Sequence, residues 1–358
     1  MSSIRLQMHS ALLALVTGGF MAQSAAADVS DAGTRSTLAH GVGVRALALG
    51  GAYVSLADDA DAVTWNPAWL TQLRRHSFAA TYVDLPEGTE LHSASWGGYF
   101  DGIGGIGVAF SRLGADDFPA VINWVPQPGA ISYSTSITTA ALAVSVTDEL
   151  SVGASGRALY ESLFGLNDFS FGLNAAAAYR RGHFRAGVLI RDLVSNELDL
   201  GAAGENEPLA AQLGVSLSEL RISELLKATA AFDVELIENR DPIVHSGVEG
   251  VLGDVVSLRL GLSRDDITFG AGFTINRLKI DYAYRTLDNL SDSHRFGLSL
   301  SFGKSVSQRR ADAREKHESL GRSYAASERQ GRASESYQRA QSYESAGELD
   351  SALLAYEV

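Results

Sequence analysis

The chain has no cysteine and only 7 prolines among its 358 residues. Disulfides and thiolate metal ligands are therefore excluded, and the fold has to be stable without covalent cross-links. Its net charge of −13 argues against nucleic acid as a partner, because phosphate binding needs a basic surface. After the first 27 residues there is also no apolar run long enough for a membrane-spanning helix. Glycine, in contrast, is common, at 36 residues.

Residues 1–27 have the composition of an export signal. Arg5 supplies positive charge, Ala11 to Met21 is apolar, and three alanines precede Asp28. The apolar stretch is shorter than the roughly 18 to 20 residues that a helix needs to cross hydrocarbon, so a cleaved signal peptide is favoured over a membrane anchor. We expect the mature chain to begin at Asp28. Export without a helical span leaves the periplasm, the outside or an outer-membrane barrel of a diderm bacterium as its location.

Residues 77–303 consist of segments of about ten residues in which apolar side chains occupy every second position, the period of a β-strand with unlike faces. Strands of soluble sandwiches usually have about five or six residues, whereas a tilted strand needs roughly nine to eleven to cross a bilayer. There are fourteen such segments, and an even number is typical of single-chain bacterial barrels. We therefore predict an all-β fold, a 14-stranded antiparallel transmembrane β-barrel. The predicted strands are 77–84, 91–100, 103–112, 138–147, 150–161, 169–180, 183–191, 208–217, 226–237, 243–252, 255–264, 267–275, 278–286 and 294–303.

The connections between these strands alternate between tight turns and longer loops, as expected of periplasmic turns and outward loops. The exception on the periplasmic side is 218–225, where we expect a short helix. The outward loop 113–137 is unexpectedly apolar, and exposed apolar surface often marks a binding site. Its candidate ligand or cargo contacts are Phe118, Ile122, Trp124 and Ile131.

If the apolar side chains face lipid, the alternate positions point into the barrel, and these carry charges of both signs. Two interpretations remain open. The charges can pair and fill the interior, which is the usual use of buried charge, or they can form a polar wall around a gated path. The predicted lumen charges are Arg157, Arg185, Asp233, Glu235, Arg259, Asp281 and Arg285.

The segment 28–76, ahead of the barrel, contains Gly-Gly-Ala at 50–52, Asp-Asp-Ala at 58–60 and Asn-Pro-Ala at 66–68. These motifs, in this order, closely resemble the N-terminal segment of FadL-like outer-membrane proteins, most of all their PorV/PorQ branch. With the strands, the resemblance covers about residues 35 to 303. It implies a fourteen-stranded barrel with an internal hatch. It also implies transport of hydrophobic compounds, as in FadL members, or shuttling in type IX protein secretion, as in PorV members.

Backbone geometry gives the same motifs a role in a compact plug. Adjacent glycines permit a close approach or a positive φ, and proline keeps the preceding residue out of the helical region. We expect the acids to bind plug backbone or pair with lumen arginines, since they lack the spacing of a calcium-binding loop, and we predict no metal site. The plug motif residues are Gly50, Gly51, Asp58, Asp59, Asn66, Pro67 and Ala68.

Signatures of catalysis and of cofactor binding are weak. The chain has no HExxH, no GxSxG and no P-loop, and the GxGxxG match at 102–107 lies in an alternating strand with no helix to follow it. We therefore predict no cofactor and no enzyme. A barrel enzyme whose triad comes from distant strands is the remaining alternative.

Residues 304–358 differ in character, because nine basic residues balance nine acidic ones, whereas 28–303 has a net charge of −14. This tail reads as helix. Small and aromatic residues from Leu320 to Ala340 resemble a tetratricopeptide repeat, and a second register from Tyr343 overlaps the first. One alternative is an incomplete repeat that folds on a periplasmic partner, and the other is a plain solvated helix.

Three functions follow from these observations. The first is transport of a hydrophobic solute, the second is a PorV-like shuttle for a secreted protein cargo, and the third is an anchor for a periplasmic helical scaffold. The expected further partners are outer-membrane lipid and the barrel-assembly machinery, since the aromatic ending at Phe302 resembles its recognition strand. The short outward loops favour PorV-like ancestry, which does not by itself fix function.

Overall fold

The computed structural model describes residues 41–85, 88–122, 125–163, 166–196, 207–264, 266–286 and 293–356. The predicted signal peptide lies outside these residues. The chain divides into two compact units, one up to Gly303 and one from Lys304 to Val358. No helix among the described residues combines the length and the apolar character needed to cross a membrane.

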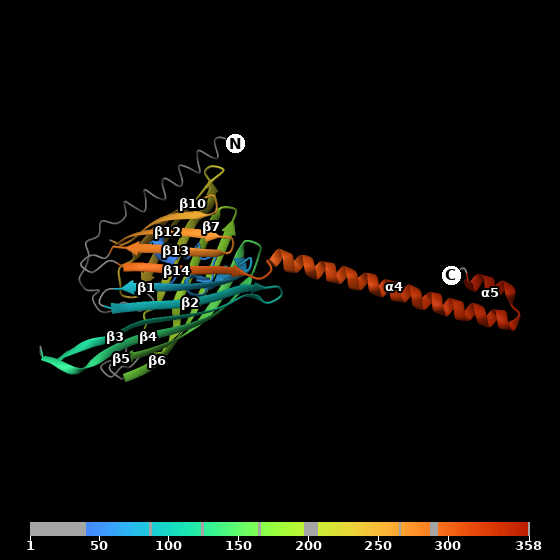
Figure 1. The fold of residues 1–358 in the computed structure, drawn as a ribbon, viewed down its shortest axis with the longest axis horizontal. Coiled ribbons are helices and arrows are strands. Elements are labelled where there is room, and N and C mark those ends of the chain that lie inside the picture. The colour runs from blue at the N-terminus through green and yellow to red at the C-terminus, as the bar shows by residue number, and fades with distance from the viewer. Residues whose placement is uncertain are drawn as a thin grey trace. The chain divides into compact units, whose positions relative to one another are not determined.

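The first unit is a closed barrel of fourteen antiparallel strands in sequence order, in which β14 pairs with β1 to complete the circle (Figure 1). The predicted fold class is thus confirmed. The strands are β1 His76–Leu85, β2 Thr89–Phe100, β3 Gly104–Ile122, β4 Val125–Ser145, β5 Leu150–Leu163, β6 Leu166–Arg181, β7 Phe184–Ser195, β8 Ala210–Arg221, β9 Leu226–Ile237, β10 Ile243–Leu252, β11 Val256–Ser263, β12 Asp266–Ile275, β13 Leu278–Arg285 and β14 Ser293–Phe302.

Alternation along the strands separates an apolar outer wall from a polar inner one. On β12, Phe269 and Phe273 are about half exposed on the outside, whereas Thr268 is buried inside. On β14, Phe296 faces outward and Arg295 is buried. An apolar outer surface of this kind suits contact with lipid hydrocarbon.

The β3–β4 hairpin corrects the prediction of an outward loop at 113–137, because most of that segment is strand. The two strands remain paired through Phe118 opposite Ile131 and Ile122 opposite Val125, with register shifts between Ala115 and Val121. Pairing lets each strand satisfy the backbone groups of the other beyond the point where β2 and β5 end, so the hairpin extends past its neighbours (Figure 1). Trp124 lies outside the described residues.

The short helix expected at 218–225 is also wrong. Strand β8 continues to Arg221 across a bulge between Leu217 and Leu220, and the Ser218 amide donates to the His183 carbonyl at 2.8 Å. An extra residue in a bulge lets the ladder continue where strict alternation fails. The predicted tight turns are present, with φ values of 84° at Gly102, 62° at Gly182 and 55° at Asn276.

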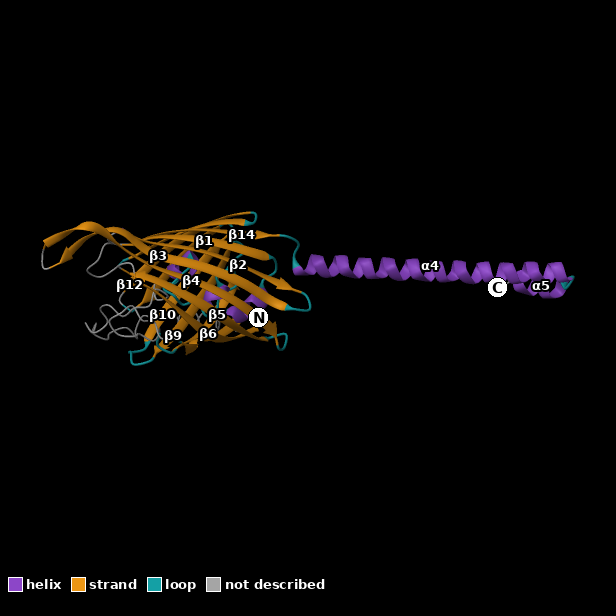
Figure 2. Cartoon of the chain, turned by 90° about the horizontal axis from the view of Figure 1, so that it is seen from below, coloured by secondary structure: helices purple, strands orange, loops and turns teal. Residues whose placement is uncertain are grey.

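The segment before β1 folds inside the barrel as a plug, which we define as residues 41–75. It contains α2 (Val44–Ala48), α3 (Ala62–Trp65) and the 3₁₀ helix η3 (Pro67–Gln72), drawn inside the strands in Figure 2. Tyr53, Leu56 and Trp69 are among its fully or almost fully buried side chains. They form one apolar core with small inward-facing wall residues, so plug and barrel are packed as a single body.

The second unit is helical, with α4 (Val306–Ala346) followed by α5 (Leu349–Tyr356). Ser305 and Gln308 form a capping box at the start of α4, and Gly347 ends it with a φ of 80°. The predicted repeat beginning at Leu320 is wrong, because one unbroken helix runs through that register. Its polar sequence contains no proline, and its two glycines, Gly321 and Gly331, each cost a long helix only about 1 kcal/mol.

Candidate functional site in the barrel lumen

The Gly50-Gly51 turn presses the plug against the barrel wall. Both glycines have positive φ, 66° and 85°, and a Cβ on Gly50 would lie 2.6 Å from the backbone of Leu262 in β11. The Gly50 carbonyl also lies 2.8 Å from Nδ1 of His245 on β10. No other residue type fits this conformation and this close approach without strain.

The Asn66-Pro67-Ala68 motif ties the plug to itself and to β6. Oδ1 of Asn66 accepts the amide of Ala68 at 3.1 Å and so caps η3, in which Pro67 is the first residue. Nδ2 of Asn66 donates to the carbonyls of Val54, at 2.9 Å, and of Ala177 in β6, at 3.1 Å. The side chain thus fixes three segments, and all of its neighbours are backbone groups of the protein.

Asp233, a predicted lumen charge on β9, anchors the middle of the plug. Its Oδ2 accepts the backbone amides of Tyr53 at 2.8 Å and Val54 at 2.9 Å, and the side-chain amide of Gln212 at 3.0 Å. The carboxylate is fully buried. Three donors on this oxygen offset part of the loss of hydration, whereas Oδ1 is buried without a hydrogen-bond partner within the described residues.

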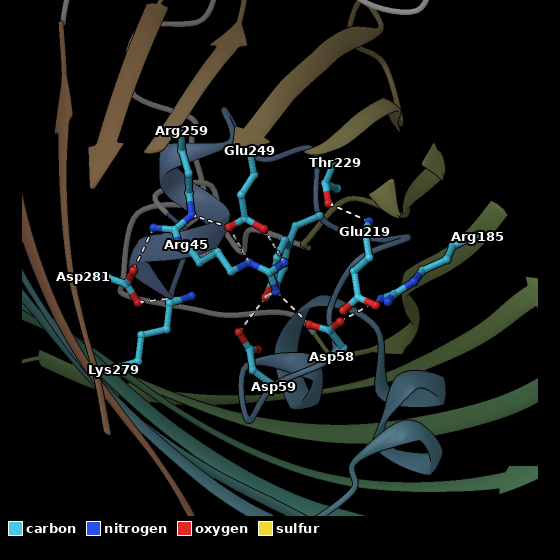
Figure 3. A network of polar contacts seen from close by, with 11 residues as sticks. Arg45, Asp58, Asp59, Arg185, Glu219, Thr229, Glu249, Arg259, Lys279 and Asp281 are labelled. Atoms are coloured by element: carbon cyan, nitrogen blue, oxygen red, sulfur yellow. Dashed lines mark hydrogen bonds and ion pairs between the residues drawn. The ribbon is translucent and has the colours of Figure 1, made fainter. Parts of the chain in front are cut away.

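A chain of alternating charges crosses the lumen and is centred on Arg45 of the plug (Figure 3). Its guanidinium donates to both carboxylate oxygens of Glu249, at 3.1 and 2.9 Å, and to Oδ1 of Asp58 at 2.7 Å. On the far side of Asp58, Arg185 of β7 donates to Oδ2 at 2.8 Å. Arg45 therefore links β10 to β7 through the plug.

The chain of charges continues along the opposite wall. Arg259 of β11 donates to Glu249 at 2.6 Å and to Oδ1 of Asp281 at 2.7 Å. Lys279 follows, 3.7 Å from Oδ2 of Asp281. The members Arg185, Asp58, Arg45, Glu249, Arg259 and Asp281 form what we call the plug network. Removing one partner from a largely buried ion pair of this kind is strongly destabilising.

The three acids of the plug have different electrostatic surroundings. Burial would raise the pKa of Asp58, but Arg45 and Arg185 outweigh it and hold that pKa at about 2. Burial, reinforced by the charge of Asp59, raises the pKa of Asp61 to about 7. Asp61 accepts a hydrogen bond from Ser95 Oγ at 2.7 Å, and Asp59 accepts one from the Tyr53 hydroxyl at 2.5 Å. Asp58 is thus the ion-pairing member.

The remaining predicted lumen charges form separate pairs near the end of the barrel at which β3 and β4 are joined. Arg157 donates to Asp192 at 2.7 Å, with both side chains buried. Arg285 pairs with Asp266, and Glu235 pairs with Arg191 and lies 3.3 Å from Nε2 of His245. The seven predicted lumen charges are therefore distributed over five clusters, namely the plug network, the Asp233 anchor and these three groups.

Two cavities lie on opposite sides of the plug. The outer cavity, of about 120 Å³, is at the β3–β4 end and is bordered by Leu47, Trp65 and the glycine turn. The inner cavity, of about 630 Å³, is at the other end and is bordered by Arg45 and the three plug acids. An open path would have to pass the plug.

Sequence reasoning missed the central residue of the site. Arg45 lies in the segment ahead of the barrel, but nothing local marks it, because its partner Glu249 is 204 residues away. The contact of the Tyr53 amide with Asp233, across 180 residues, was missed for the same reason. In the described residues no group of three or more His, Cys, Asp or Glu side chains is placed to hold a metal ion.

No protein-family model matches the chain, and no curated protein matches it. Solved structures do match. The toluene transporter TbuX of Ralstonia pickettii has a TM-score of 0.52 at 13% identity, covering 74% of this chain and 99% of that one. The toluene transporter TodX of Pseudomonas putida has a TM-score of 0.52 at 12% identity, covering 73% and 97%. The chain therefore shares the fold of these two transporters.

Proposed function

We propose that this protein is an outer-membrane channel that transports small hydrophobic molecules. The observation that carries the proposal is a lumen closed by a plug with a cavity on each side of it. Such an interior has room for a solute at two stations, which the described residues of the plug separate. The shared fold with two toluene transporters supports the same function and an outer-membrane location.

The secretion-shuttle alternative has less support. Its predicted cargo loop at 113–137 is instead the extended β3–β4 hairpin, and the matched structures named above are transporters. The anchor alternative rests on the tail alone. Neither accounts for two cavities bordered by one plug.

The direct test is uptake of radiolabelled toluene by cells that carry the full chain in their outer membrane. Cells are needed because toluene crosses a phospholipid bilayer unaided. We expect faster uptake than in cells that carry the empty vector, with total protein synthesis matched between the two. Equal uptake would show that the proposed function is wrong.

The role of the plug is tested with an engineered disulfide, which is easily interpreted because the chain has no native cysteine. In Val44→Cys/Gly297→Cys the two Cβ atoms would lie about 3.0 Å apart, slightly closer than a disulfide prefers, and would join α2 to β14. We expect the oxidised pair to lower uptake and a reductant to restore it.

The matched control is Ser134→Cys/Ser162→Cys. These residues lie directly opposite each other on β4 and β5. This disulfide joins two strands that are already paired and leaves the plug free. Uptake that is unchanged by the plug disulfide would mean that the solute bypasses α2.

A further inference from the structure

The outer cavity has the size and lining of a site for one ring. Its volume of about 120 Å³ is close to that of the roughly 150 Å³ cavities that admit benzene. Leu47 and Trp65 of the plug, with Ile237 and Ile243 of the wall, provide an apolar side. A long alkyl chain does not fit in this volume.

Arg295 on β14 borders the same cavity and lacks a counter-charge within the described part of the chain. Its side chain is 2% exposed, and the hydrogen bond that it makes is to Oγ of Ser293 at 3.3 Å. Its cross-strand neighbours, Val83 and Ala283, are apolar. Asp266, on the same cavity, is held by Arg285.

A buried guanidinium without a carboxylate is costly unless something pairs with it. Arginine is also the side chain best suited to bind a planar carboxylate through two parallel hydrogen bonds. One cavity thus combines an apolar side large enough for a single ring with a buried guanidinium that has no paired carboxylate within the described residues.

The charges lining both cavities have the same bias. Five arginines and four carboxylates border the outer cavity, and eight cationic and five acidic side chains border the inner one. This positive bias occurs in a chain whose overall net charge is −13. Low-dielectric walls focus such a potential and concentrate anions within it.

We infer that the outer cavity is a binding site for a single-ring monocarboxylate. The carboxylate pairs with Arg295, and the ring packs on the apolar side formed by Leu47 and Trp65. This goes beyond neutral hydrophobic solutes, and its role in uptake rests on the proposed transport function. Benzoate is the simplest probe of this class.

The test is calorimetric titration of the purified full chain in detergent with benzoate and with benzyl alcohol, which has the ring without the charge. We expect benzoate to bind at least about tenfold more tightly, since a charge-assisted pair is worth about 1.5–3 kcal/mol and 1.4 kcal/mol is tenfold. Arg295→Gln should weaken benzoate binding by a similar factor and leave benzyl alcohol unchanged. Arg181→Gln, in which an exposed arginine of the opposite end is removed, is the matched control.

The outcomes separate this inference from the function. If the wild-type protein binds benzyl alcohol and benzoate equally tightly, the inference is wrong. This result does not depend on whether Arg295→Gln folds. If cells take up toluene but the protein does not bind benzoate, the channel function stands and the carboxylate site falls. If benzoate binds as expected but cells take up neither toluene nor benzoate, the carboxylate site stands and the transport function is wrong.

Discussion

Arg45→Met is the substitution that most directly tests how the plug is held. Methionine keeps most of the length of the side chain but removes the contacts to Glu249, Asp58 and the Tyr53 hydroxyl. Glu249 then keeps Arg259, and Asp58 keeps Arg185, but each carboxylate loses one of its two cations. The barrel wall is not altered, so the effect should be confined to the plug.

The size of the effect follows from burial. Removing one partner of a buried ion pair costs about 3–5 kcal/mol. Side-chain exposure is 16% for Arg45 and 29% for Asp58, which places the cost at the lower limit, about 3 kcal/mol. Because 1.4 kcal/mol is tenfold, the equilibrium for plug opening should shift by about two orders of magnitude.

Amide hydrogen exchange measures this opening without unfolding the barrel. The amides of Leu47 and Leu49, which are hydrogen-bonded within α2, should exchange about a hundredfold faster in Arg45→Met, while those of β9 and β10 stay protected. Arg181→Met is the control, because Arg181 is 76% exposed in its side chain. If the α2 amides of Arg45→Met exchange within a few-fold of the wild-type rate, the loss is no larger than that of a surface ion pair. That result would refute the view that the plug network holds the plug.

Three further predictions concern separate parts of the chain. Asp61 has a raised pKa of about 7, so the plugged state binds more protons than the released state between about pH 4 and 7, and plug retention should strengthen as pH falls through this range. Protection factors of the α2 amides at pH 5.5 and 8 check this. Asp61→Asn should weaken the dependence and leave the part that comes from Asp59, whose pKa burial also raises; the opposite trend would contradict the assignment. Gly214→Ala would put a Cβ 2.0 Å from Oδ1 of Asp233, so the carboxylate must move. Tryptophan fluorescence should then report a loosened plug, whereas unchanged spectra would mean that the barrel wall moves instead. Gly347→Ala places alanine in the left-handed region at a cost of about 1 kcal/mol, so exchange at 349–356 should rise about fivefold while the barrel is unaffected; equal exchange would place the turn elsewhere.

Strand positions were predictable because lipid on one side and a polar lumen on the other impose a two-residue period. The bounds of β9 and β10 coincide with the prediction, and both strands alternate in this way. The β3–β4 extension was not predictable from that period, because the sequence of 113–137 lacks strict alternation and contains three prolines and two glycines. Such residues favour a loop when the sequence is taken alone.

The candidate site was only partly accessible from sequence. Strand parity places Arg185, Asp233 and Arg259 on the inner face, as the structure does. Which of them meet depends on how the plug folds, and sequence parity carries no information about that. Asn66 illustrates the same limit, since its cap on η3 is a local pattern but its bond to Ala177 spans 111 residues.

The plug network also constrains the order of folding. Its central contact joins Arg45 to Glu249 across 204 residues, and Asp233 meets Tyr53 across 180. Contacts of such high sequence separation form late, because the intervening chain must first lose its conformational entropy. The β1–β14 seam that closes the barrel and the plug's contacts to β10 and β12 both need the later strands. Seating of the plug and closure of the barrel are therefore coupled steps of assembly, and the last strands complete both.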